Sequence, residues 1–458
     1  MSTRRQMIER RGQRAGLFAS MIALAAGGPI AAQSRQIPAP PQSRPTVIAA
    51  ATVHPVTGPT LTPGYVVFEK GRITHVGQGE PPAVAGAEVI NAAGLHVYPG
   101  LIGSDTTLGL VETSSVAVTN DTTEFGRITP EARAVVAINP DSDHIPVTRA
   151  DGIMTALVFP RGGLVSGRCS TIRLDGWTWE DMAIDPEAGL VVNWPRTEPS
   201  TRGRRGRPDR KREKEQRKQI KEELESIEQL FDDAAAYLQA KDADPAQPTD
   251  LRYEAMRAAL GGAKPIFVRA SSQGQIESAI AWAVRRELEI VIVGGREAEG
   301  VIALLRKHDV PVIITGLHHL PRHRHDAYDS PFTLPAKLHE AGVRFAIASG
   351  SSSAHERALN DNAATAVPFG LPAVEALRAI TIGAAEIIGL GETHGSIEVG
   401  KAATLIVTTG DPLQITTDTR MAFIDGRRID LGNRHESLYG KYREKYRQQG
   451  KISDEVTK

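Results

Sequence analysis

From Pro99 onward, the sequence alternates short apolar segments with amphipathic ones. The apolar segments have the length of strands buried on both faces, and the segments between them space apolar residues as one helix face does. This repetition predicts an α/β protein, either an α/β barrel or a doubly wound sheet. Seven strands of an eight-strand arrangement can be recognised, but the fourth cannot be located within residues 168–194. The clearest helix follows the apolar segment 264–270 and carries Ile276, Ile280, Val284 and Leu288 on one face.

The regions on either side of this repetition have the pattern of short β-strands. Alternating runs flank Lys70 and Gly71, a pair that is typical of a hairpin turn. The sequence after the last helix of the repetition returns to the same strand pattern. The expected segments are a Pro-rich linker (33–45), a first β segment (46–98), the barrel (99–391), a second β segment (392–432) and a helical tail (433–458).

Residues 197–250 interrupt the strand–helix repetition. Ten basic and three acidic residues lie between Arg202 and Lys218. This run is either a solvated insertion or a patch that binds anionic lipid or polymer. Helical spacing then predicts an amphipathic helix packed on the body, with an apolar face of Leu224, Ile227, Leu230, Phe231, Ala234 and Leu238.

The first 32 residues have the features of an export signal and are not expected to belong to the fold. Arginines precede an apolar stretch at residues 15–25, and small residues end at Ala32, which predicts cleavage nearby. The pair Arg4 and Arg5 is similar to a twin-arginine signal, with the general secretory route as the alternative. The apolar stretch is shorter than the roughly 20 residues that span a bilayer, so no stable membrane span is expected. We therefore expect a periplasmic or secreted protein.

Charge and cysteine content limit the partners of the chain. It has 54 basic and 54 acidic residues, so its net charge gives no reason to expect nucleic acid as a partner. A small-molecule substrate or ligand is expected instead, and a homo- or hetero-oligomer stays open. Cys169 is the only cysteine, so an internal disulfide is excluded, and we expect it to be a buried small hydrophobe rather than a nucleophile.

Five phrases, in the expected order along the chain, resemble the amidohydrolase superfamily, and most closely its imidazolonepropionase and dihydroorotase-like branch. They are "VVFEKGRITHVG", "INAAGLHVYPGLI", "ALRAITIGAAEIIGL", "GSIEVGKAATLIV" and "FIDGRRID". The resemblance implies a (βα)8 TIM-type barrel with a small composite β-sandwich formed by the N- and C-terminal segments. It also implies hydrolysis of non-peptide C–N bonds, in amides or cyclic amides, by zinc or another divalent metal at the C-terminal ends of the barrel strands.

The family's metal ligands can be transferred onto this chain one position at a time. The resemblance implies a His-x-His pair after the first strand, a lysine or glutamate on the fourth, histidines on the fifth and sixth, and an aspartate on the eighth. The fourth-strand residue cannot be placed, and of the others only Asp105 can ligate a metal, while a guanidinium would repel one. We therefore expect a divergent member that lacks the usual metal ligands. The matching positions are Asp105 and Thr107, Arg269, a residue near Gly294, and Gly350 or Ser351.

A histidine-rich segment after the seventh strand offers a different site. It has three interpretations: a metal site of its own, a general acid or base, or solvated histidines on an exposed loop. Pro321 and the many charges favour the loop. The candidate metal ligands are His318, His319, His323 and His325.

A metal-free pocket is the remaining interpretation of the barrel mouth. Asp105, Thr107, Arg269, His318 and Ser351 should converge there if the transferred positions are correct. Arg269 suits a carboxylate or phosphate group, with Thr107 beside it, or else it forms an ion pair with Asp105 that fills the space of the metal. Ser351 with His318 as its base is a further arrangement, and its catalytic use is not indicated by any spacing.

A glycine-rich segment, residues 160–182, is similar to a loop found in some members of the family. Its glycines permit a tight backbone near a pocket that tryptophans could line. Tight turns beside a core tryptophan explain the same residues without a ligand. The residues concerned are Gly162, Gly163, Gly167, Trp177 and Trp179.

Three functions are compatible with these observations. The first is an exported hydrolase of non-peptide C–N bonds with a degenerate metal site. The second is a catalytically inactive, amidohydrolase-like pseudoenzyme that binds a small molecule or a partner subunit. The third is a surface-binding protein that acts through the basic insertion. Fold resemblance alone does not choose among them.

Overall fold

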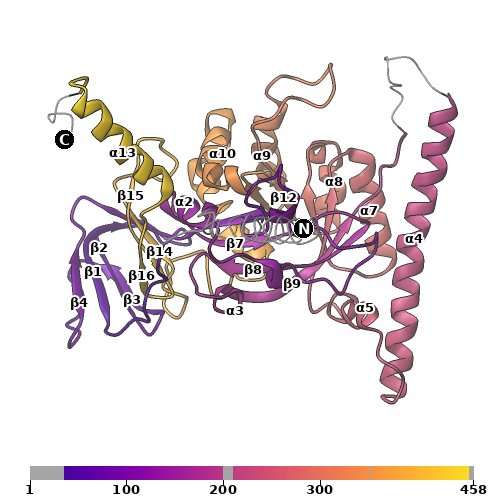
Figure 1. Ribbon diagram of the computed structural model, residues 1–458, viewed down its shortest axis with the longest axis horizontal. Helices are drawn as coiled ribbons and strands as arrows, with labels where there is room; N and C mark the ends of the chain where they lie inside the picture. Colours follow the sequence, from indigo (N-terminus) through magenta and orange to yellow (C-terminus); the bar gives the residue numbers. More distant parts are fainter. Residues whose placement is uncertain (1–35, 200–209, 351, 453–458) are drawn as a thin grey trace, which may run out of the picture. The chain divides into compact units, whose positions relative to one another are not determined.

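The computed structural model describes residues 36–199, 210–350 and 352–452 (Figure 1). The export signal predicted for residues 1–32 lies outside these residues, as does Ser351. The described residues belong to one compact unit that begins at Arg35. It contains a barrel-like sheet with helices around it, a second sheet, and two further helices, α4 (Arg210–Ala243) and α13 (Arg434–Gln448).

The barrel-like sheet has eight strands in the order β13-β12-β11-β10-β9-β8-β7-β6. Strands β8 and β9 occupy the region in which the fourth strand could not be located. Neighbouring strands are parallel except that β8 is antiparallel to both β7 and β9, which departs from a strict (βα)8 barrel. The strands are β6 (Leu101–Thr106), β7 (Ile153–Val158), β8 (Val165–Arg173), β9 (Ala183–Asn193), β10 (Ile266–Ala270), β11 (Ile290–Gly294), β12 (Val312–Thr315) and β13 (Phe345–Ala348).

The direction of β8 follows from the short connection that precedes it. Residues 159–164 join β7 to β8, whereas a parallel crossover needs about a dozen residues or more. Gly162 and Gly163 have φ angles of +82° and +63°, which this tight reversal requires. Asn193, at the end of β9, donates to the carbonyl oxygens of both glycines at 2.9 and 3.1 Å. The first residues of the glycine-rich segment, 160–164, therefore form a hairpin turn that Asn193 fixes.

A loop closes the gap between β6 and β13, the two ends of the strand order. The Ile102 amide of β6 donates to the Ile380 carbonyl at 2.9 Å, and the Ile347 amide of β13 donates to the Ala379 carbonyl at 3.1 Å. The sheet thus becomes a nearly closed barrel. Its interior contains Ile102, Phe159, Phe267, Val291, Ile313 and Ala346, all buried.

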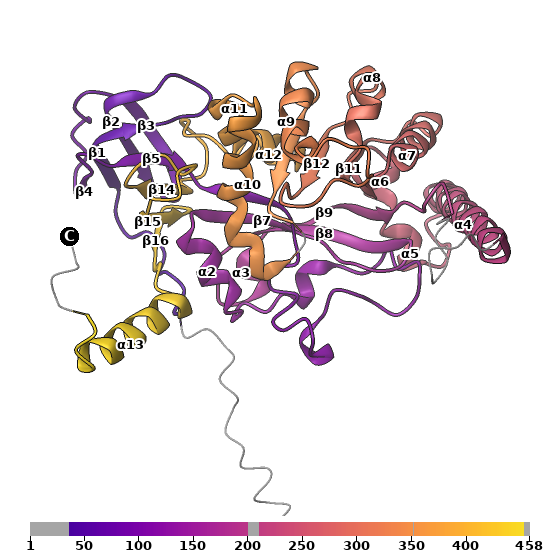
Figure 2. The same ribbon diagram turned by 90° about the horizontal axis from the view of Figure 1, so that it is seen from above.

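Helices cover the outside of the barrel strands (Figure 2). Helix α7 begins with a capping box of Ser272 and Gln275, and Ile276 and Ile280 are buried as predicted. Val284, expected on the same face, is 45% exposed, and Ala283 beside it is buried instead. The helices are α2 (His144–Ala150), α3 (Trp179–Met182), α5 (Leu251–Glu254), α6 (Arg257–Leu260), α7 (Gln273–Arg285), α8 (Ile302–Lys307), α9 (Ser330–Glu340), α10 (Leu359–Ala366), α11 (Ala373–Arg378) and α12 (Ile382–Ile387).

The second sheet is composite, as the sequence predicted. Strand β5, from the N-terminal segment, is antiparallel to β14, from the C-terminal segment. Hydrogen bonds join all eight strands into one sheet, in the order β16-β15-β14-β5-β1-β2-β3 with β4 beside β1, instead of two separate layers. The strands are β1 (Thr46–Val53), β2 (Leu61–Glu69), β3 (Arg72–Gln78), β4 (Glu88–Asn91), β5 (His96–Pro99), β14 (Leu405–Thr408), β15 (Thr419–Ile424) and β16 (Arg427–Ile429).

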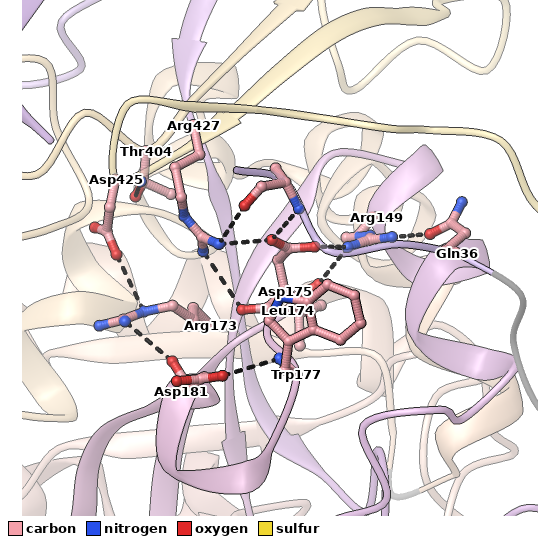
Figure 3. Close-up of polar contacts among 11 residues, drawn as sticks. Gln36, Arg149, Arg173, Leu174, Asp175, Trp177, Asp181, Thr404, Asp425 and Arg427 are labelled. Carbon is pink, nitrogen blue, oxygen red and sulfur yellow. Dashed lines mark hydrogen bonds and ion pairs between the residues drawn. The ribbon is translucent and has the colours of Figure 1, made fainter. Parts of the chain in front are cut away.

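A buried ion-pair network attaches the Pro-rich segment to both sheets (Figure 3). The Asp175 carboxylate, after β8, accepts from Arg149 Nη1 at 2.6 Å and from Arg427 Nη1 at 2.8 Å. It also accepts from the amide of Ala39 at 3.1 Å, while Arg149 donates to Gln36. The segment that the sequence suggested as a linker is therefore held in place where it meets Asp175.

Two helices lie beyond these sheets. Helix α4 (Arg210–Ala243) buries the predicted apolar residues of its second half, and Phe231 packs edge-on against Trp282 of α7 with ring centroids 4.9 Å apart. Its first turns carry the described part of the basic run, and residues 202–209 lie outside the described part of the chain. Helix α13 (Arg434–Gln448) buries none of its residues. No helix in the described ranges is long and apolar enough to cross a bilayer.

Candidate functional site

Polar and charged side chains converge at the ends of four barrel strands. Asp105 lies on β6, Arg161 follows β7, Arg269 lies on β10 and Thr315 ends β12. Of these strands, β6 and β7 are parallel neighbours, and β10 and β12 lie elsewhere around the barrel. The C-terminal ends of all four therefore face the same space. Of this group, the sequence predicted Asp105 and Arg269 and missed Arg161 and Thr315.

The Asp105 carboxylate is the centre of this group, and it has no solvent exposure. Its Oδ1 accepts from Arg269 Nη1 at 2.9 Å and from Arg161 Nη2 at 3.1 Å. Its Oδ2 accepts from Arg269 Nη2 at 3.1 Å and from the Thr315 hydroxyl at 2.9 Å. These four bonds use about all of the lone pairs that a carboxylate offers. The ion pair between Arg269 and Asp105 that the sequence suggested is thus present and bidentate.

The electrostatic environment keeps Asp105 ionised. Burial alone would raise the pKa of this carboxyl, but the guanidiniums of Arg269 and Arg161 outweigh that effect and lower the pKa to about 2. The pKa of Arg161 falls to about 10, chiefly because the side chain is buried, and Arg269 adds to this by repulsion. Both values leave Asp105 and Arg161 charged at neutral pH.

Arg269 is held from a second side by an aromatic ring. Its guanidinium carbon lies 5.4 Å from the ring centroid of Phe159, within the range of a cation–π contact. Phe159 is fully buried and packs edge-on against Phe267. The guanidinium is therefore fixed between a carboxylate and a ring.

Glu356 is a second buried carboxyl group near Asp105, and no sequence motif identifies it. Its Oε2 accepts from the Ser349 hydroxyl at 2.7 Å, whereas Oε1 is buried without a hydrogen-bond partner. A side chain at Gly103 of β6 would overlap this Oε1. Burial, with a smaller contribution from the charge of Asp105, raises the pKa of Glu356 to about 7 in spite of the hydrogen bond from Ser349.

The histidine-rich segment stacks two of its imidazoles, those of His323 and His325, but does not gather all four. His318 bonds Thr365 at 2.8 Å, and His323 bonds Glu297 at 2.9 Å. His325 lies against the ring of His323, with centroids 5.3 Å apart, and burial lowers the pKa of His319. No three ligating side chains gather at one point within the described ranges. This geometry favours the exposed-loop interpretation.

The other predicted residues have simpler surroundings. Thr107 is 5% exposed just after β6, and Ser351 lies outside the described residues, so its pairing with His318 stays a prediction. Trp177 is 66% exposed. Cys169 is fully buried, and burial raises the pKa of its thiol, which makes the thiolate needed by a nucleophile scarce.

The residues at the ligand positions do not fit a divalent metal. Asp105 alone has ligand chemistry there, and both of its oxygens already accept from N–H and O–H donors. Arg269 places a fixed positive charge where the family resemblance expects a histidine. A cation brought to Asp105 would have to displace this guanidinium and would meet that of Arg161.

Comparison with known proteins agrees with the architecture. The amidohydrolase family model matches residues 191–430, more than half of the chain. Amidohydrolase tasK of Hapsidospora irregularis is 23% identical over 391 residues, which are 79% of this chain and 39% of that protein. An imidazolonepropionase of Sphingopyxis alaskensis is 31% identical over 122 residues, 26% of this chain and 28% of that protein. The chain thus spans less than two fifths of either curated relative.

Solved structures extend the agreement to the three-dimensional arrangement. The crystal structure of an amidohydrolase from Thermotoga maritima is 25% identical and has a TM-score of 0.74, covering 84% of this chain and 99% of that one. Molinate hydrolase, at 14% identity and a TM-score of 0.51, covers 86% and 96% and shows the shared fold. By its family model and by these structural neighbours, the chain belongs to the amidohydrolase family.

Proposed function

We propose that this chain is a metal-free member of the amidohydrolase family that binds a small molecule at the barrel mouth. The observation that carries the proposal is the bidentate pair between Asp105 and Arg269. A buried carboxylate and a fixed guanidinium neutralise each other at positions where the family resemblance implies metal ligands. A rigid, partly exposed polar mouth of this kind is suited to recognition of a small molecule.

The first test is the metal content of the mature protein. Elemental mass spectrometry of folded protein purified without a histidine tag should give far less than one zinc, manganese or iron per chain. Hydrolysis of amides and cyclic ureides should be absent with and without added metal. Stoichiometric metal together with chelator-sensitive hydrolysis would overturn the proposal. Replacing His323 by alanine shows whether any metal found belongs to the histidine-rich loop.

A second candidate function is hydrolysis of a non-peptide C–N bond without metal, and Glu356 is the observation that favours it. A carboxyl group with a pKa of about 7 suits general acid–base chemistry near neutral pH. Because Glu356 is fully buried, the 3-10 helix η4 (Ser353–Ala358) that carries it would have to move before a substrate could reach it. An amidase activity that Glu356→Gln abolishes and that follows a pKa near 7 would support this function over binding alone.

We also propose that the protein acts in the periplasm or after secretion. The support is the N-terminal sequence, where paired arginines precede an apolar stretch and small residues. Replacing Arg4 and Arg5 by lysines should retain the precursor in the cytoplasm if export follows the twin-arginine route. Unchanged export would point to the general secretory route, and retention of the wild-type protein in the cytoplasm would contradict the proposal.

A further inference from the structure

The barrel mouth carries an excess of positive charge. Arg161 and Arg269 share the single carboxylate of Asp105, and the other acidic group nearby, Glu356, has its pKa raised to about 7 by burial. Two guanidiniums, one carboxylate and a carboxyl that is about half ionised at pH 7 leave roughly half a positive charge uncompensated in a poorly solvated place. An excess charge in such a place attracts ions of opposite sign more strongly than it would in water.

Both guanidiniums keep hydrogen-bond donors for a ligand. A guanidinium has five N–H groups. Among the contacts of the described residues, the Arg161 side chain donates one N–H group to Asp105, and the Arg269 side chain donates two. The spare N–H groups are in the same plane as those already used, because the guanidinium is planar.

The exposure of the three side chains shows from which side a ligand can approach. The side chains of Arg161 and Arg269 are 20% and 17% exposed, whereas that of Asp105 has no exposure. Solvent therefore reaches both arginine side chains and not the Asp105 carboxylate. A ligand can contact both arginines without displacing Asp105.

The site is also pre-organised. Asp105 and the ring of Phe159 fix Arg269 from two sides, and the backbone amide of Arg161 donates to the Thr122 carbonyl at 2.6 Å. Side chains that are already ordered lose less entropy when a ligand binds. The contact with Asp105 thus orients the guanidiniums in addition to compensating part of their charge.

From this geometry we propose that Arg161 and Arg269 form a binding site for the oxyanion group of a small ligand, a carboxylate or a phosphate. This inference rests on the proposed function, because a metal-loaded mouth would present a different charge. The planar N–H forks match the two oxygens of a carboxylate or of a phosphate, whereas neutral amides and cations have no matching group.

Titration calorimetry on the mature protein, in low-salt buffer without carboxylate or phosphate, tests the site. The probes are benzoate, inorganic phosphate and, as the neutral counterpart of benzoate, benzamide. We expect saturable binding of benzoate or phosphate that weakens as salt is added, and none of benzamide. The stronger of the two anions identifies the class of oxyanion. Absence of saturable binding by both anions would overturn the proposal.

Variants of Arg161 show whether the binding occurs at this site. Arg161→Gln leaves the Asp105–Arg269 pair in place. It should lower the affinity for the anion about tenfold or more, as loss of a hydrogen bond between charged groups does. Arg161→Lys keeps the charge but not the planar fork, so it should bind phosphate better than benzoate. The control Arg306→Gln, on the exposed face of α8, makes the same charge change away from the mouth and should bind as the wild type does. Equal affinity of Arg161→Gln and wild type would refute the site.

The metal content of the same preparations separates this inference from the proposed function. Metal-free protein that binds neither anion would overturn the oxyanion site and leave the metal-free assignment standing. Metal-loaded, hydrolytically active protein would overturn the assignment itself, whatever anions it binds.

Discussion

Arg269 donates to both carboxylate oxygens of Asp105, which lies 164 positions earlier in the sequence and is fully buried. The pair connects β6 with β10 across the barrel, with Arg161 and Thr315 bound to the same carboxylate. Four hydrogen bonds from side chains on different strands thus hold this carboxylate in place. Because two guanidiniums share one carboxylate, the charge of this group is a property that substitutions can test.

Replacing Asp105 by asparagine should destabilise the protein by about 3 kcal/mol, because two poorly solvated guanidiniums lose their counter-ion. The change would be measured as the shift in urea-unfolding midpoint. Asp309→Asn is a matched control, since Asp309 is paired with Arg344 but is 79% exposed, and it should cost less than about 1 kcal/mol. Equal effects of the two substitutions would contradict the role assigned to Asp105.

Glu356 should make stability depend on pH. Its pKa rises from an ordinary 4.5 to about 7 in the folded protein, so between these values the folded state binds a proton that the unfolded state does not. Stability from this group is therefore fully present below pH 4.5 and is lost as the pH rises through 7, at about 1 kcal/mol per pH unit at most. Glu356→Gln should remove that slope, which denaturant unfolding from pH 4.5 to 8 would measure.

The pH dependence of unfolding must be compared between Glu356→Gln and the wild type, because other groups titrate in the same pH range. Burial raises the pKa of Asp151 to about 6, which acts in the same direction, and lowers that of His54 to about 4, which acts in the opposite one. The difference between the two unfolding curves isolates Glu356. A variant that keeps the full pH slope would show that Glu356 is ionised in the folded protein.

Asp175 should hold the N-terminal segment against both sheets. Asp175→Asn removes the charge that Arg149 and Arg427 share, and all three side chains are at most 18% exposed. We expect a loss of about 3 kcal/mol and faster hydrogen exchange at the amide of Ala39, which donates to Asp175. Unchanged exchange at Ala39 would mean that other contacts hold this segment.

The spacing of hydrophobic residues predicts where strands and helices lie along the chain. It does not predict in which direction a strand runs. Buried strands are apolar whether they run parallel or antiparallel, so the reversal at β8 is visible only in the short, glycine-rich connection before it. The composite sheet was predictable because the strand pattern returns near the C-terminus. The division into one sheet or two depends on strand pairing between distant segments, which the pattern does not contain.

The same limit explains which site residues could be found. Asp105 and Arg269 lie on strands whose order fixes where they meet, so their pairing could be suggested in advance. Arg161 follows its strand in a glycine-rich turn, and Glu356 lies in the short 3-10 helix η4 (Ser353–Ala358) after β13, so neither has a position set by strand spacing. Burial of Glu356 beside Gly103 is a result of packing between distant segments and leaves no local signal.

Phe231 should show that the second half of α4 belongs to the folded body. The side chain is fully buried against Trp282, so Phe231→Ala should lower the free energy of unfolding by about 3–5 kcal/mol through the cavity it leaves. Ile220→Ala, on the first half of the same helix and only partly buried, is the control and should cost about 1 kcal/mol or less. Thermal and urea unfolding of both variants would decide the matter. If Phe231→Ala were as mild as its control, α4 would be an independent helix, and the apolar contacts of its second half would not contribute to the stability of the barrel.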